Sequence, residues 1–284
     1  MVSAPPIRRR LVGRALRRYR EGLGYTLEDA ARVLECDRSK ISRIETGQRG
    51  IRRKELRELL TEYGIDWDQQ AVLGRLADPR GGLGWHRDYA GVLPGAWRDY
   101  LSLETAASKI SVYEAQRVPG LLQTAAYARA LAETDPSLED EAAVDRATEA
   151  VLARQQAILG GESRPQVRLI MGQAALHQEV GGPAVMDEQL IALGRAAGDS
   201  GTVTVQVLPF ESGAHAAAGD GSLSVLQFPE APGLGLVHTG GIGGGVCLEG
   251  RDDLAAYARV FEQLRAFALG PAQSALLLRG LAGE

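Results

Sequence analysis

The sequence predicts two domains: an all-α domain of five helices over residues 7–77 and an α+β domain over 85–284, joined by a linker over 78–84. Two patterns lead to this division. Apolar residues recur with helical spacing in the first domain, whereas short alternating segments typical of strands occur only in the second. Between them, Ala-Asp-Pro-Arg-Gly-Gly-Leu-Gly breaks every period and indicates a flexible joint.

The charge is divided in the same way. Residues 1–80 carry 18 Arg and Lys against 12 Asp and Glu, a net of +6, and the remaining 14 basic and 24 acidic residues give −10. A basic end on an acidic chain is typical of a domain that binds a polyanion, although a solvated basic face would have the same composition.

The location of the protein follows from what the sequence lacks. Cys36 and Cys247 lie too far apart for metal-ligand spacing and indicate reduced cytosolic thiols. No signal peptide is evident at the start, and no apolar run approaches the roughly 18–20 residues of a membrane span. We therefore expect a cytoplasmic protein without a membrane segment.

The five helices of the first domain follow from their apolar faces and their end signals. Thr26 with Asp29 three residues later forms a capping box, and Asp37 is a suitable N-cap for the helix that follows it. We expect these helices over residues 7–19, 27–34, 38–45, 51–63 and 66–76.

The third of these helices has a polar outer face. Ile41 and Ile44 face the core, which leaves Arg38, Ser39, Ser42 and Arg43 pointing outward. Two short helices joined by a tight connection, the second of them basic on its exposed face, describe a helix-turn-helix whose second helix enters the major groove of DNA.

These residues resemble the XRE/Cro-repressor type of helix-turn-helix regulator. The stretch from Asp37, Asp-Arg-Ser-Lys-Ile-Ser-Arg-Ile-Glu-Thr-Gly, carries most of the resemblance. Two positions depart from the family pattern: Leu27 replaces a Gln that grips a phosphate, and Glu35 replaces a turn Gly. The resemblance nevertheless implies a DNA-binding fold.

The resemblance also implies roles for individual side chains, and the alternative for each exposed arginine is a solvated surface charge. It places Arg20 and Glu45 in a structural ion pair between the first and third helices. Base edges would be contacted by Arg38, Ser39, Ser42 and Arg43. Phosphates would be held by Thr26, Lys40, Thr46, Gln48, Arg49 and Arg52.

The second domain mixes helices and short strands. We expect helices over 97–113, 123–132, 139–159, 184–197, 252–269 and 272–281. We expect strands over 167–171, 203–208, 222–228, 234–238 and 246–248, separated by Gly-rich turns, in a small mixed sheet.

Several of these segments resemble the uncharacterised effector-like domain that follows an XRE-type domain in a large group of actinobacterial regulators. The most specific is Val118-Pro-Gly-Leu-Leu-Gln-Thr-Ala-Ala-Tyr-Ala. Members look like regulators of development and secondary metabolism, or like the antitoxin-like half of a pair with a small acidic partner protein. A Tyr-x-Glu common on a late strand is here Val237-His238-Thr239, which implies a different ligand or partner.

No catalytic or metal-binding arrangement is visible, so we expect neither an enzyme nor a cofactor. His215, His238 and Gln123 are candidates for a ligand pocket, although a lone His is more often structural. The leading hypothesis is a transcription regulator that binds double-stranded DNA as a homodimer and senses a small-molecule effector or a partner protein. The alternative is an antitoxin-like protein that binds a small partner and autoregulates its own operon.

Overall fold

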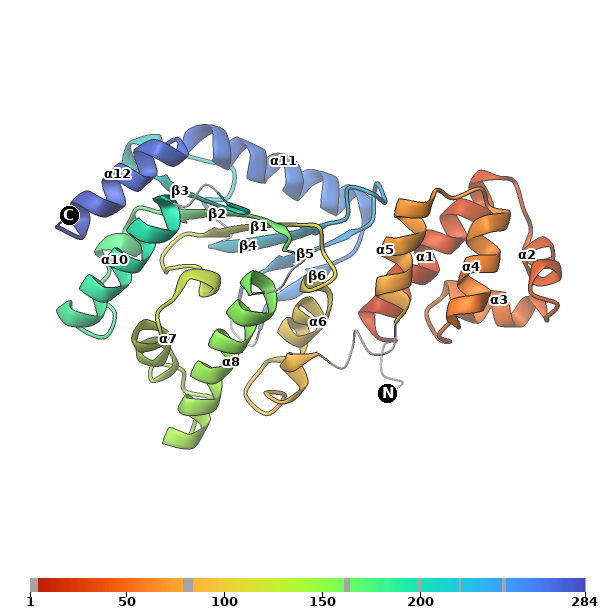
Figure 1. Ribbon diagram of the computed structural model, residues 1–284, viewed down its shortest axis with the longest axis horizontal. Coiled ribbons are helices and arrows are strands. Elements are labelled where there is room, and N and C mark those ends of the chain that lie inside the picture. Colours follow the sequence, from red (N-terminus) through yellow and green to blue (C-terminus); the bar gives the residue numbers. More distant parts are fainter. Residues whose placement is uncertain are drawn as a thin grey trace.

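The computed structural model describes residues 5–78, 84–160, 164–198, 201–219, 221–241 and 244–283. Figure 1 shows a helical head (residues 5–78) beside a larger body (the described residues from 84 onward) that contains a sheet. Of the predicted linker over 78–84, residues 79–83 lie outside the described residues. No helix in the described ranges is long and apolar enough to cross a membrane.

The head is all-α, as the sequence predicts. Its described residues form α1 (Ile7–Gly22), α2 (Leu27–Val33), α3 (Arg38–Glu45), α4 (Arg53–Glu62) and α5 (Trp67–Ala77). The capping box at the start of α2 is present: the Thr26 hydroxyl accepts from the Asp29 amide, and the Asp29 carboxylate accepts from the Thr26 amide. Local end signals of this kind explain why the helix boundaries could be predicted closely.

The body is built on a mixed sheet, in agreement with the predicted α+β class. Within the described residues the sheet has six strands in the order β3-β2-β1-β4-β5-β6. In this order β3, β2 and β1 are parallel, and the pairs β1–β4, β4–β5 and β5–β6 are antiparallel. The strands are β1 (Lys109–Glu114), β2 (Gln166–Gly172), β3 (Val203–Leu208), β4 (Ser222–Gln227), β5 (Gly235–Thr239) and β6 (Val246–Leu248).

Helices cover both faces of this sheet. In Figure 1, α11 (Arg251–Phe267) runs along one face, and α6 (Gly95–Glu104), α7 (Ala125–Ala132) and α8 (Glu141–Leu159) lie on the other. At the β3 end, α10 (Pro183–Gly198) packs beside α12 (Pro271–Leu281). The short helix α9 (Ala174–His177) and the 3₁₀ segments η2 (Trp85–Arg87), η3 (Gly120–Leu122) and η4 (Phe210–Ser212) complete the body's described elements.

The predicted helix over 97–113 is wrong in its second half. The helix α6 ends at Glu104, and residues 109–114 form β1, which lies at the centre of the sheet between β2 and β4. Ile110 and Val112 face the helices α6 and α8, while Tyr113 faces α11, so the strand is buried on both sides. Polar and apolar residues alternate only over 109–112, and Ile110 also continues the helical spacing of α6, so the pattern of this short strand also fits a longer helix.

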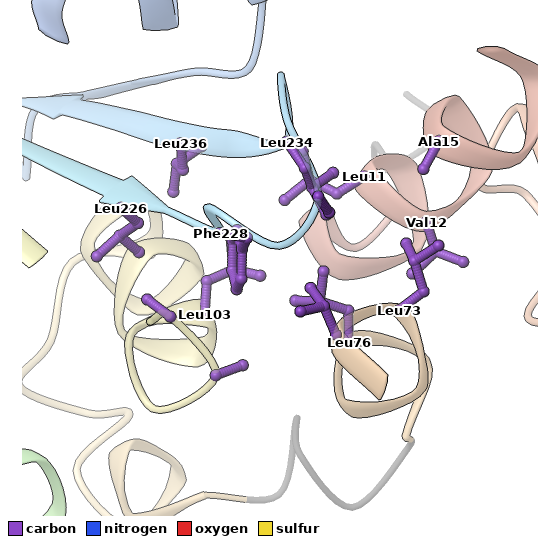
Figure 2. Packing of buried hydrophobic residues seen from close by; sticks show 14 of the residues in the cluster. Leu11, Val12, Ala15, Leu73, Leu76, Leu103, Leu226, Phe228, Leu234 and Leu236 are labelled. Atoms are coloured by element: carbon purple, nitrogen blue, oxygen red, sulfur yellow. The ribbon is translucent and has the colours of Figure 1, made fainter. Parts of the chain in front are cut away.

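Head and body share one hydrophobic core. Figure 2 shows Leu11 and Leu76 of the head beside Phe228 and Leu234 of the body, and all four belong to the same cluster of buried residues. Ion pairs from Arg10 and Arg14 of α1 to Glu249 reinforce the contact. The two parts are therefore packed against each other.

Candidate DNA-binding surface

The connection between α2 and α3 uses an unusual backbone conformation. Glu35 has φ +47°, in the left-handed region that glycine adopts most easily. This is the position at which the sequence departs from the family's glycine. The turn geometry is thus retained despite the side chain, and α3 begins directly after Asp37.

The outer face of α3 presents the residues predicted to contact bases. Ile41 and Ile44 are buried in the core, whereas Arg38, Ser39 and Arg43 are exposed. Ser42, also predicted to contact bases, is half-buried on the same helix.

Arg38 and Arg43 form only weak hydrogen bonds on the protein surface. Arg38 donates to the Glu28 carboxylate over 2.9 Å, and Arg43 donates to the Ser39 carbonyl over 3.2 Å. An exposed pair such as Arg38–Glu28 contributes at most about 1 kcal/mol, so Arg38 can exchange this partner for a base edge.

The residues predicted to hold phosphates are not equally available. Lys40 is paired with Glu55 of α4 at 2.7 Å and is only 18% exposed, so its ammonium group ties α3 to α4. The Thr26 hydroxyl is engaged in the capping box, and the Thr46 hydroxyl donates to the Ser42 carbonyl over 2.9 Å. Five of the six residues are exposed, and contact with DNA is most direct for Gln48, Arg49 and Arg52.

A buried ion pair fixes α3 against α1. Arg20 binds Glu45 through two hydrogen bonds of 2.6 and 2.9 Å and also donates to the Tyr25 carbonyl. The hydrogen bond that Arg20 donates to Glu45 raises the pKa of Arg20, and the guanidinium stays charged. At Gly13 a Cβ atom would lie 2.5 Å from the Glu45 carbonyl oxygen, so α1 crosses directly over the end of α3.

The three candidates for a ligand pocket do not line one pocket. Tyr113 of β1 pairs with Leu223 of β4, and His238 of β5 pairs with the next residue of β4, Ser224. Because neighbouring strand residues face opposite sides, His238 lies on the α6 face and Tyr113 on the α11 face, where the ring of His215 packs against it. The sheet therefore separates His215 from His238.

Each of the three candidates has a structural environment of its own. The His238 ring lies against Trp97, and its Nε2 is 2.7 Å from the Gly244 carbonyl oxygen. Burial lowers the pKa of His238. Gln123 is buried and donates to the Val118 carbonyl over 2.8 Å, while Nδ1 of His215 has no hydrogen-bond partner among the described residues.

The sequence analysis missed a buried ion pair in the body. Arg154 of α8 binds Glu104 of α6 through hydrogen bonds of 2.8 and 2.7 Å, and Glu104 is fully buried. The Tyr100 hydroxyl also donates to Glu104, and the Arg154 guanidinium lies 4.9 Å from the centre of the Trp97 ring. Burial alone would lower the pKa of Arg154, but the adjacent Glu104 carboxylate raises it above its ordinary value.

Comparison with known proteins matches both parts of the chain. The family described as a helix-turn-helix domain matches residues 11–73, which makes the head the DNA-binding part of a regulator. A second family matches residues 97–280, most of the body. No curated protein and no solved structure matches the chain. This second match covers more than half of the chain, so the chain belongs to the family described as a domain of unknown function (DUF5753).

Proposed function

We propose that this protein is a sequence-specific transcription regulator of the XRE/Cro-repressor type, from the actinobacterial group of such regulators, and acts in the cytoplasm as a homodimer. The observation that carries the proposal is the outer face of α3. It presents Arg38, Ser39 and Arg43 to solvent from a helix whose other face is locked into the core. A helix with this distribution of side chains fits the major groove.

The arrangement of head and body supports the proposal. Figure 1 shows α5 and α1 next to the body, with α2 at the far end of the head. The contacts to the body come from α1 and α5, through Leu11, Leu76 and the Glu249 ion pairs. The α2–α3 face is therefore left open to DNA.

A homodimer follows from the size of the head. One small module buries too little surface for tight operator binding, and two heads on half-sites one helical turn apart supply the rest. We infer that the body controls the spacing of the two heads in response to a ligand or a partner protein that prefers one arrangement.

The proposal is tested by recovering the genomic DNA fragments that the purified protein binds at physiological salt. The wild type should enrich a two-fold symmetric motif, and the double variant R38A/R43A should lose it. Loss of one bidentate base contact costs about 1–3 kcal/mol, or roughly 5–150-fold in discrimination. The matched variant R52A, which removes a charge from an exposed position after α3, should weaken operator and random DNA alike and reduce the salt slope by about 1.

Two results would count against this assignment. Equal losses on operator and random DNA in R38A/R43A would refute base reading by α3. Absence of any motif for the wild type would favour the antitoxin-like alternative, in which the body first binds a small partner protein.

A further inference from the structure

A cavity of about 840 Å³ lies between the head and the body. The head contributes residues from α1, from the end of α3 and the segment after it, and from the end of α5, and the body contributes residues from η2 and α6. A cavity of this size accommodates a metabolite as large as a nucleotide. Any molecule bound there would contact both parts of the chain at once.

The lining of this cavity is strongly basic. Among its described lining residues, five arginines face two aspartates. The arginines are Arg8, Arg9, Arg49, Arg87 and Arg98.

Four of these arginines form no ion pair with a described carboxylate, although Arg98 interacts electrostatically with Asp99. The side chains of Arg9, Arg49, Arg87 and Arg98 form no ion pair within the part of the chain that the structure describes. The fifth, Arg8, is fixed by backbone carbonyl groups, including that of Leu76 over 3.2 Å.

The acidic residues do not offset this excess. Asp78 interacts electrostatically with Arg8 of the cavity and also pairs with Arg53 outside it, at 3.4 Å, so two aspartates face five arginines. Asp99 is partly buried, and burial raises the pKa of its carboxyl group. The cavity therefore carries a net positive charge.

His86, which is 6% exposed in the cavity wall, responds to this charge. Burial lowers the pKa of His86, and the neighbouring Arg87, Arg8 and Arg98 lower it further. The imidazole is therefore neutral in the folded protein at neutral pH. The arginines thus add to the effect of burial in disfavouring a further cation there.

Part of the remaining lining is apolar and accessible: Pro6, Ile51, Ala77 and Ala90 provide it. We propose that this cavity binds a small phosphorylated metabolite, with its phosphates held by the arginines and its organic part against these apolar side chains. Guanidinium groups bind phosphate oxygens in a bidentate manner, which suits Arg9, Arg49 and Arg87, whose side chains form no ion pair with a described carboxylate.

Such a ligand would act as a bridge between α1 of the head and α6 of the body. The regulatory role rests on the proposed function, because it requires the head to bind DNA. Binding across the boundary stabilises the packed arrangement of head and body relative to any arrangement that opens the cavity. The ligand would thereby change the affinity for operator DNA.

The binding site itself is tested without DNA. Inorganic pyrophosphate is titrated into the full-length protein by calorimetry, with the wild type compared with R87Q, R98Q and R259Q. Arg87 and Arg98 are exposed residues of the body and are remote in sequence from α3, while Arg259 is an exposed arginine of α11 outside the cavity. Unchanged circular dichroism and melting temperature establish that the variants fold.

We expect one pyrophosphate per chain for the wild type and for R259Q, with at least tenfold weaker binding for R87Q and R98Q. Equal affinity in all four proteins, or no binding to the wild type, would overturn the site. If R87Q and R98Q weakened random DNA as much as pyrophosphate, the arginines would belong to a DNA-backbone surface, which would also overturn it.

The regulatory step is tested separately on the operator. Pyrophosphate should shift operator affinity of the wild type at least threefold and leave that of R87Q/R98Q unchanged. An unchanged affinity of the wild type would refute the bridge. The R38A/R43A variant tests the proposed function, through base contacts of α3, whereas pyrophosphate binding without DNA tests the cavity. Failure of one can therefore be distinguished from failure of the other.

Discussion

Replacing Glu104 by Gln should strongly destabilise the body. The carboxylate is fully buried and holds both Arg154, through bonds of 2.7 and 2.8 Å, and the Tyr100 hydroxyl. E104Q keeps the shape of the side chain but leaves the Arg154 charge buried without a counter-charge. Breaking a buried pair in this way costs about 3–5 kcal/mol, a large part of the 5–15 kcal/mol that stabilises a typical domain.

The measurement is urea unfolding followed by tryptophan fluorescence, since Trp97 lies over the Arg154 guanidinium and reports on this site. A second variant, E104L/R154M, removes both charges and should unfold within about 1 kcal/mol of the wild type, because apolar replacement of a whole buried pair is close to neutral. The control is E58Q, which removes the carboxylate of an exposed pair with Lys54 and should cause no measurable change.

A loss below about 1 kcal/mol in E104Q would refute the reasoning, because it would mean that water reaches Arg154 and screens its charge. So would a double variant less stable than E104Q, because the pair would then contribute more than the cost of burying its charges.

Three further predictions concern single side chains. E35G should raise the free energy of unfolding by about 0.5–1 kcal/mol, because a left-handed backbone costs a residue with a side chain about 1–2 kcal/mol. The gain is smaller than this cost because glycine also has a higher conformational entropy in the unfolded chain. G24A, at φ +72°, should conversely lower the melting temperature. Burial lowers the pKa of His238, so the unfolded chain binds more protons than the folded protein below about pH 6.5, and stability is lost as the pH falls. H238Q should reduce the dependence of the melting temperature on pH between pH 8 and 5. An unchanged pH dependence would contradict this. Burial raises the pKa of Cys247 to about 12, so in C36S this thiol should react with a disulfide reagent at pH 8 only after unfolding, and fast reaction of the folded protein would disprove its burial.

The head could be predicted from the sequence because its signals are local. Thr26 and Asp29 cap α2 from three residues apart, and Ile41 and Ile44 mark the inner face of α3 within one turn. The helix-turn-helix and its exposed Arg38 follow from such short-range patterns. The pairing of Lys40 with Glu55 on the next helix did not, because it depends on how α3 and α4 pack.

The parts of the body that were missed depend on contacts distant in sequence. The central strand β1 pairs with β2 and β4, which follow it much later in the chain, and the alternation over 109–112 is too short to identify a strand by itself. Glu104 and Arg154 are 50 residues apart, and neither looks buried in its own helix. The cavity arginines come from both parts of the chain, so their convergence could not be inferred from the overall basic charge of the first 80 residues.

The shared core has a consequence for synthesis. Leu234, which covers Leu11 in Figure 2, leaves the ribosome about 220 residues after it. At about 5–20 residues per second, the delay is on the order of 10–45 s. During this interval the helices of the head can form while the apolar side that will meet the body stays uncovered. The nascent chain therefore exposes the apolar side of the head until the body has been synthesised, and we expect this interval to favour aggregation or chaperone binding.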